Sequence, residues 1–205
     1  MLLIEKPILL KYTPSLLKES IEKNTGNLIL RSVPIITAEE ENGNGRYYRK
    51  ELWEREMSKF KKKIDEATTE SCGELDHPDS EIINLSNISH CFRDIKWDGK
   101  IVKADIEVFC SEGVKGTPSG RILGAFLHNG LAVGFSTRGT GTLKQVGDIM
   151  EVQDDFTYIT TDAVSNPSNY GSWSRLNENK QIQSYSNLDK IIKEILCSKG
   201  NCPIL

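Results

Sequence analysis

The sequence predicts an α+β protein in which strands outnumber helices. Residues 27–36 and 156–164 are rich in β-branched and aliphatic side chains, as strands are. Residues 88–97 and 101–110 flank Asp98-Gly99, and an Asp-Gly pair between two apolar runs is a strong hairpin signal. Only two or three segments carry apolar residues at the 3.6-residue period of a helix. We therefore expect a mainly β core with a few helices packed outside it.

Composition limits the class of protein further. The 205 residues suffice for one domain, with or without a tail, and the net charge of -3 gives no general reason to expect nucleic-acid binding. No apolar run approaches the ~20 residues that span a membrane, and the N-terminus does not resemble a signal peptide. Five irregularly spaced cysteines argue against a secreted disulfide scaffold and fit a reducing cytoplasm.

The first half of the chain combines strands with one long helix. Residues 1–26 are expected to form a short strand and a polar connector, and Pro34 predicts an edge or a bulge in the strand that follows. Two Asn-Gly pairs predict turns within residues 39–46. A helix is expected over residues 49–65, because four apolar residues fall on one stripe at 4-3-4 spacing: Trp53, Met57, Phe60 and Ile64.

The opposite face of this helix is basic. It carries Lys59, Lys61, Lys62 and Lys63, which is compatible with a patch that binds nucleic acid. Acidic residues interleave with basic ones just upstream, at Glu51, Glu54 and Glu56. That mixture favours a solvated helix face.

A second, shorter helix is expected over residues 121–129, after Thr117-Pro118-Ser119-Gly120. Gly130 stands where a C-terminal cap belongs. Strands are expected at residues 131–135 and 148–152. The helix residues expected to face the core are Ile122, Leu123, Phe126 and Leu127.

The C-terminal region differs in composition from the rest. Residues 165–168 predict a turn, residues 169–186 have the polar composition of a linker, and residues 187–205 predict a helical tail stopped by Gly200 and Pro203. The apolar face of that helix would consist of Leu188, Ile191, Ile192, Ile195 and Leu196.

Ser136 is the first candidate for chemistry. It follows a short apolar run, and Gly139 and Gly141 come soon after it, with Arg138 between. A strand that delivers a hydroxyl into a glycine-rich turn presents a nucleophile and lets backbone N–H groups approach an oxyanion. The alternative is a strand that runs into an ordinary turn.

A serine nucleophile needs a base, and the chain offers three histidines. His128 ends the predicted short helix and His90 lies within a strand, whereas His77 lies in a polar loop between acidic residues. Asp162, near the end of an apolar strand, is the first candidate for the group that orients the imidazole, with His90 and Glu74 as alternatives. Asp162 is equally compatible with a turn-capping role.

A zinc site is a competing interpretation. Cys72, His77, His90, Cys91 and Cys110 are the candidate ligands, but none shows C-x-x-C or H-x-x-x-H spacing. Cys197 and Cys202 lie in the tail. We therefore expect no metal and no cofactor.

Three blocks in order resemble the prohead proteases of T-even-type tailed phages. They are Asn42-x-Asn44-x-Arg46-x-Tyr48, Gly73-Glu74-Leu75-Asp76-His77-Pro78 and Gly134-Phe135-Ser136-Thr137-Arg138-Gly139-x-Gly141, with a weaker fourth, Asp162-Ala163-Val164-x-x-Pro167-Ser168. The resemblance covers roughly residues 25–170.

The resemblance implies a serine endopeptidase with an assemblin-like antiparallel β-barrel, related to herpesvirus maturation proteases. It implies that Ser136 is the nucleophile and His77 the base, and that Arg138 and Gly139 serve the oxyanion through backbone N–H groups. The herpesvirus relatives use a second histidine after the serine, which this chain lacks. Asp162 falls in a comparable region and is assigned there as a hypothesis.

The resemblance also implies a biological setting. Such proteases lie inside the prohead, in the bacterial cytoplasm, with scaffold and major capsid proteins as substrates, often cut after glutamate. They also cleave themselves, so we expect a protease domain at residues 1–168, self-association, a zymogen stage and removal of the tail at residues 187–205 on maturation. The alternative is a non-catalytic capsid or scaffold-associated protein on the same fold.

Overall fold

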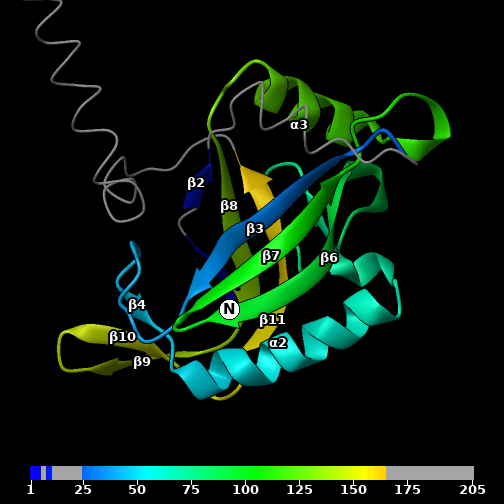
Figure 1. The fold of residues 1–205 in the computed structure, drawn as a ribbon. Coiled ribbons are helices and arrows are strands. Elements are labelled where there is room, and N and C mark those ends of the chain that lie inside the picture. The colour runs from blue at the N-terminus through cyan, green and yellow to red at the C-terminus, as the bar shows by residue number, and fades with distance from the viewer. Residues whose placement is uncertain (6–7, 11–24, 165–205) are drawn as a thin grey trace, which may run out of the picture. The chain divides into compact units, whose positions relative to one another are not determined.

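The computed structural model describes residues 1–5, 8–10 and 25–164, whose strands form three sheets (Figure 1). The first sheet has the order β3-β7-β6-β5, with bounds Leu28–Thr37, Ile101–Val108, Ile88–Asp98 and Cys72–Glu74. The second contains β1 (Leu2–Ile4), β2 (Ile8–Leu10), β8 (Val133–Thr140) and β11 (Thr157–Val164). The third has the order β4-β10-β9, with bounds Arg46–Tyr47, Ile149–Val152 and Leu143–Val146.

The first sheet confirms the predicted hairpin. Strands β6 and β7 are antiparallel, and Gly99 adopts a φ of 62° in the turn between them, where a side chain would be strained. Strand β3 stands at the edge of this sheet, and its register shifts between Pro34 and Ile36. The edge and the bulge predicted from Pro34 are therefore both present.

The second sheet is organised around β8. Strands β1 and β2 pair with one edge of β8 and β11 pairs with the other, all antiparallel. The prediction that the strand ends before Ser136 is wrong, because β8 continues to Thr140. Gly139 is needed there for close packing, since a Cβ on it would lie 2.6 Å from the Phe156 ring.

The mainly β class is confirmed, whereas the barrel is not observed in the described part of the chain. None of its three sheets closes on itself, and only an isolated parallel bridge, Leu75 to Ala163, joins the first sheet's β5 region to β11. Alternating polarity predicts strands, but it does not fix how the ends of separate sheets meet.

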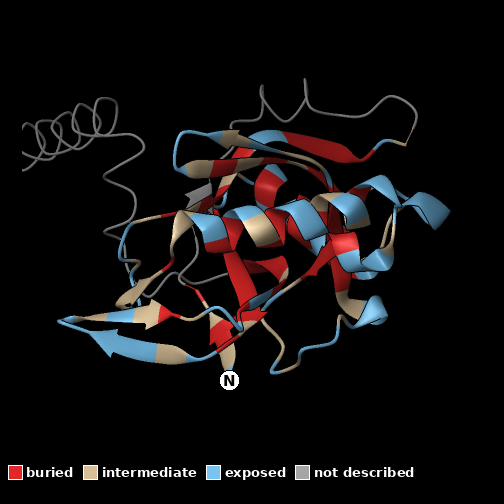
Figure 2. Cartoon of the chain, turned by 90° about the horizontal axis from the view of Figure 1, so that it is seen from below, coloured by how far each residue is buried: buried red, intermediate tan, exposed pale blue. Residues whose placement is uncertain are grey.

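The long helix α2 (Lys50–Asp65) confirms the predicted apolar stripe. Trp53, Met57, Phe60 and Ile64 are all buried in the main core. Figure 2 shows the helix with buried residues along one side and exposed residues along the other. Glu56 is buried as well, and its Oε2 accepts a hydrogen bond from the backbone N–H of Tyr158, which ties α2 to β11.

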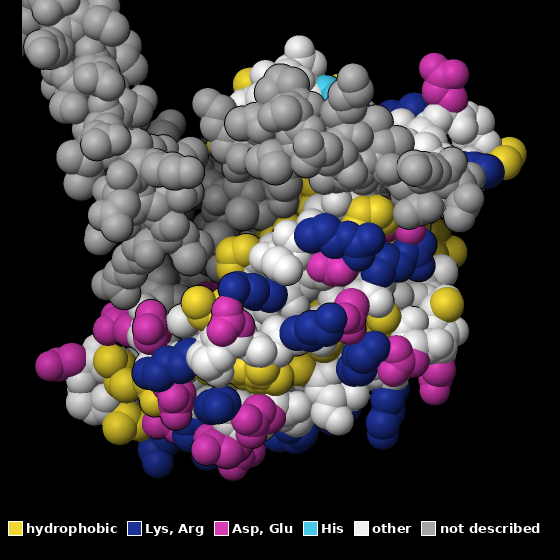
Figure 3. Space-filling model, viewed as in Figure 1, with side chains coloured by type: hydrophobic (Ala, Val, Ile, Leu, Met, Phe, Trp, Pro, Cys, Tyr) yellow, Lys and Arg dark blue, Asp and Glu magenta, His cyan; other side chains and the backbone are white. Residues whose placement is uncertain are grey.

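The basic face of α2 carries ion pairs with acids. Lys59 pairs with Glu56, Lys61 with Asp65 and Lys63 with Glu70. Basic and acidic side chains are mixed over the face shown in Figure 3. These pairs favour the solvated face over a patch of one sign.

The short helix α3 (Pro118–His128) begins three residues earlier than predicted, with Thr117 as its N-cap. Leu123 and Leu127 are buried as expected. The expectation for the other two apolar residues is wrong, since Ile122 is 46% exposed and Phe126 is 40% exposed. Helical spacing placed four residues on one broad face, but only part of that face meets the sheet.

Some sequence predictions lie outside the described residues. These are the turn at 165–168, the linker at 169–186 and the tail at 187–205. In the described part, no helix is long and apolar enough to cross a membrane. Within the described residues, a disulfide joins Cys72 on β5 to Cys91, its cross-strand partner on β6.

Candidate active site

The geometry brings Asp162 and His77 together. Asp162 lies on β11 directly opposite Ser136 on β8, so the two side chains emerge on the same face of the sheet. Asp162 Oδ2 lies 2.8 Å from His77 Nδ1. When Nδ1–H donates in this bond, Nε2 is left with a lone pair that can accept a proton.

Ser136 and His77 each present one unused buried atom. Ser136 Oγ and His77 Nε2 have no hydrogen-bond partner among the described residues, so they do not bond to each other in this conformation. Buried polar atoms nearly always find partners, and exceptions concentrate at functional sites. Catalytic hydrogen bonds are often long before substrate binds, so this geometry fits a serine and base awaiting a substrate.

Arg138 has a role that its sequence position did not reveal. Its guanidinium is fully buried and bonds both carboxylates beside the site, with Nε 2.8 Å from Asp162 Oδ2 and a terminal nitrogen 2.8 Å from Glu74 Oε1. Another terminal nitrogen donates to the Ser80 carbonyl. The predicted oxyanion role through the Arg138 and Gly139 backbone stays a prediction.

Asp162 therefore accepts hydrogen bonds from several distant residues and does not cap a turn. Its Oδ1 accepts from the backbone N–H of Glu74, 3.0 Å away, while Oδ2 serves His77 and Arg138. The alternative orienting acid, Glu74, pairs with Arg138, and His77 Nδ1 bonds to Asp162. These three residues, of which Arg138 bonds both carboxylate oxygens, keep the Asp162 carboxylate in one orientation.

His90 lies behind the site and is fully buried. Its Nε2 is 3.1 Å from the Thr161 carbonyl and its Nδ1 is 2.9 Å from Ser89 Oγ. Burial lowers the pKa of His90 to about 4, so its ring is neutral at neutral pH. Gly73 packs against it so closely that a Cβ would lie 2.4 Å from His90 Nε2. These contacts give His90 a packing role beside Asp162.

The other candidates lie apart from this cluster. His128 is exposed at the end of α3. Among the described residues, no three His, Cys, Asp or Glu side chains are grouped to hold a metal ion, and Cys72 and Cys91 bond to each other. Cys110 is a free, partly buried thiol.

A third buried carboxylate, that of Glu5, lies further along β8, on the opposite sheet face from the Ser136 side chain. Glu5 follows β1, and its backbone N–H donates to the carbonyl of Thr137, the residue after Ser136. Its side chain is only 9% exposed and accepts bonds from four side chains, which we call the Glu5 cluster: Asn42, Asn44, Arg46 and Tyr48.

The four donors of the Glu5 cluster are the residues of the first sequence block, for which sequence reasoning found no role. Asn42 and Asn44 bond one carboxylate oxygen, while Arg46 and Tyr48 bond the other. Burial and the neighbouring Glu5 carboxylate raise the pKa of Tyr48, so its hydroxyl remains a donor. The alternate spacing of the four was the available signal, because it places them along one short segment.

Comparisons with known proteins identify the family of this chain. Residues 6–184 match the model of the prohead core protein serine proteases. The solved structure of the bacteriophage T4 capsid assembly protease gp21 is similar to this chain, with a TM-score of 0.62 and 26% identity, over 80% of this chain and 98% of that chain. No curated protein sequence matches. Because the family match spans most of the chain, this protein belongs to the prohead core protein serine proteases, a phage family that acts in capsid assembly.

Proposed function

We propose that this serine protease cleaves scaffold and major capsid proteins inside the prohead, using Ser136, His77 and Asp162. The observation that carries the assignment is the Asp162–His77 bond, made from a position directly opposite Ser136. His77 Nε2 takes the Ser136 proton as Oγ attacks the peptide carbonyl, and then gives it to the leaving amine. Asp162 orients the imidazole and stabilises its charged form.

The Glu5 cluster supports cleavage after glutamate. An arginine, two amides and a tyrosine hydroxyl that donate to one carboxylate form a site complementary to a glutamate side chain. The backbone of Glu5 runs along β8 beside Ser136, as a bound peptide would in strand addition. We infer that the chain's own residues Leu3-Ile4-Glu5 occupy the substrate position and that self-cleavage takes place at Glu5–Lys6.

Co-expression tests the protease assignment. The full chain is produced with the scaffold and major capsid proteins of its phage, as wild type, as Ser136→Ala and as Ser58→Ala, an exposed serine on α2. Wild type and Ser58→Ala are expected to shorten both substrates, and Ser136→Ala to leave them intact. Cleavage by Ser136→Ala would refute the assignment of the nucleophile.

Mass spectrometry of mature particles tests self-cleavage. A chain that begins at Lys6 is expected, together with loss of the tail at residues 187–205. The Ser136→Ala chain should keep both ends when it is packaged alone. An intact 205-residue chain in mature wild-type particles would contradict both cuts.

A further inference from the structure

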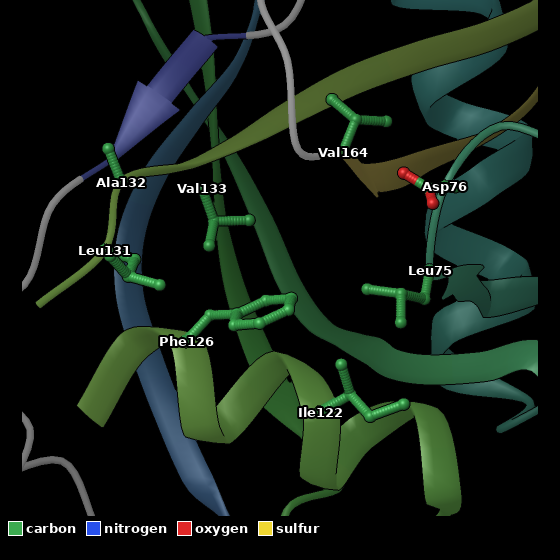
Figure 4. Close-up of a pocket in the computed structure, with 8 residues that line it drawn as sticks. All are labelled: Leu75, Asp76, Ile122, Phe126, Leu131, Ala132, Val133 and Val164. Carbon is green, nitrogen blue, oxygen red and sulfur yellow. The ribbon is translucent and has the colours of Figure 1, made fainter. Parts of the chain in front are cut away.

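An apolar pocket of about 510 Å³ opens beside the proposed active site (Figure 4). Its walls come from α3, from the start of β8, from the end of β11 and from the segment before His77. The apolar residues that matter here are Leu75, Ile122, Phe126, Leu131, Val133 and Val164. The Asp76 carboxylate lies at one side, and no basic residue contributes to the lining.

The pocket adjoins the catalytic residues through the chain itself. Val164 lies two residues beyond Asp162 on β11 and therefore on the same face of the strand, roughly 7 Å along it. Its partner on β8 is Gly134, which leaves this face free of a side chain two residues before Ser136. Leu75 and Asp76 immediately precede His77. A peptide at Ser136 therefore reaches the pocket within a few residues.

The lining includes apolar side chains that the fold leaves exposed. Ile122 and Phe126 turn away from the core contacts of α3, and Leu131 is 52% exposed. Burying a side chain of this size is favourable, so these three gain from an apolar occupant. A volume of this order holds more than one side chain.

The direction of a bound peptide follows from β1 and β2. Both lie antiparallel along the same edge of β8, with β1 opposite Arg138–Thr140 and β2 opposite Val133–Phe135. Glu5 bonds to the backbone of Thr137 on one side of Ser136, and β2 pairs on the other side with the start of β8, where Val133 lines the pocket. A substrate bound in this way places the residues on the carboxyl side of its cleaved bond at the pocket end.

We propose that this pocket is a subsite for apolar side chains on the carboxyl side of the cleaved bond in protein substrates. The proposal rests on the proposed protease function, because it takes the peptide direction and the cleaved bond from it. The enzyme would then read two features of one peptide, a glutamate on the amino side and an apolar residue after the cut.

Three substrates separate the pocket from the chemistry. One is acetyl-Leu-Ile-Glu with a chromogenic amine, which has nothing beyond the cleaved bond. A second is a fluorogenic peptide, Leu-Ile-Glu-Lys-Pro-Ile-Leu-Leu, that copies residues 3–10. A third replaces the last three residues by Ser-Ser-Ser. Wild-type full chain is expected to cleave the apolar peptide with a kcat/KM about 10-fold above that of the serine peptide.

Variants locate the preference in the pocket. Phe126→Ser and Leu131→Ser are expected to reduce the ratio of the two peptide kcat/KM values to near one. Val146→Ser, on β9, is the matched control, since Val146 is 45% exposed and does not line the pocket. An unchanged ratio in both pocket variants, with urea unfolding like wild type, overturns the proposal. So does a change in sedimentation-derived mass that leaves the ratio intact, because the pocket would then serve contacts between copies.

A binding measurement keeps the two proposals distinguishable. The Ser136→Ala full chain is titrated with fluorescein-labelled versions of both peptides, and about 10-fold tighter binding of the apolar peptide is expected. If no substrate is cleaved by wild type but this difference persists and disappears with Phe126→Ser, the protease chemistry fails and the pocket stands. Equal binding of the two peptides refutes the pocket alone.

Discussion

Two buried carboxylates lie along β8 on opposite faces of the sheet, and the chain holds them in different ways: Asp162 is opposite Ser136, and Glu5 is opposite Thr137. Asp162 belongs to an eight-residue strand and is fully buried against Arg138, Glu74 and His77. Glu5 follows a three-residue strand at the edge of β8, and its donors all come from residues 42–48. The Asp162 carboxylate is part of the core, whereas the Glu5 carboxylate is bound by side chains of another segment and could be replaced there by a second carboxylate. This difference suits a fixed catalytic group beside an exchangeable ligand.

The largest expected effect tests Asp162 as a catalytic group. Asp162→Asn keeps the shape and one acceptor but removes the charge that stabilises the imidazolium, so kcat on the chromogenic glutamate substrate should fall roughly 10³- to 10⁴-fold. Asp148→Asn, at an exposed acid, is the control. Full activity of a folded Asp162→Asn chain would break the comparison, since Asp162 would then be structural like its neighbour Glu74.

The next effect compares the two arginines. Arg138→Met leaves the Asp162 and Glu74 carboxylates buried without their shared cation, so the free energy of unfolding should fall by about 3–5 kcal/mol. Arg46 is one-fifth exposed, and Arg46→Met leaves the Glu5 carboxylate its three other donors, so the smaller loss of about 1.5–3 kcal/mol is expected. Urea unfolding measures both.

Adding Glu74→Gln to Arg138→Met should restore part of the stability, because one uncompensated charge is removed. Equal losses for Arg138→Met and Arg46→Met would show that both carboxylates are held in the same way. The Asp162 and Glu5 carboxylates would then not differ in how strongly the fold depends on their arginine partners.

His90, which lies beside Asp162, is expected to make the free energy of unfolding depend on pH. Burial lowers its pKa to about 4 in the folded protein, against an ordinary value of 6.5, so the unfolded chain binds more protons between these values. The stabilising contribution is complete above pH 6.5 and is lost as pH falls through 4. Its full size is about 3 kcal/mol.

Urea midpoints measured from pH 4 to pH 7 check the His90 prediction. Wild type should lose stability toward the acid end, and His90→Gln should remove much of that slope. A slope that survives unchanged in His90→Gln would refute His90 as the source of the acid sensitivity.

Sequence patterns predicted local elements better than the assembly of the site. The α2 stripe and the Asp98-Gly99 hairpin were predictable because periodicity and turn chemistry act within a few residues. Ser136, His77 and Asp162 were identified through ordered motifs, and residue chemistry alone left each with an ordinary alternative. The exposure of Ile122 and Phe126 was not predictable, because it depends on how far α3 extends past the sheet.

The charge network was missed for a related reason. Because Arg138 closely follows a candidate nucleophile, its position predicts an oxyanion role for its backbone N–H and gives no sign of what its guanidinium binds. Its partner Glu74 is 64 residues away in the chain, and no local pattern reports a contact across that separation. The Glu5 cluster likewise joins the N-terminus to residues 42–48, and only the fold brings them together.

The smallest expected effect tests the site that binds the Glu5 carboxylate. Tyr48→Phe removes one donor to the Glu5 carboxylate, and a hydrogen bond to a charged group is worth about 1.5–3 kcal/mol. We expect kcat/KM for the chromogenic glutamate substrate to fall about 10-fold, with a smaller fall for the glutamine analogue. Discrimination between glutamate and glutamine should therefore weaken. Tyr47→Phe is the neighbouring control.

The outcome decides what the Glu5 cluster binds. If Tyr48→Phe lowers only the free energy of unfolding and leaves the glutamate-to-glutamine ratio unchanged, the cluster merely fastens the N-terminus. If the ratio falls, the same donors that hold Glu5 also read the substrate, and the chain's first residues compete with every substrate for them. Removal of residues 1–5 should then raise the rate on short substrates, because the carboxylate that leaves is the one that the substrate replaces.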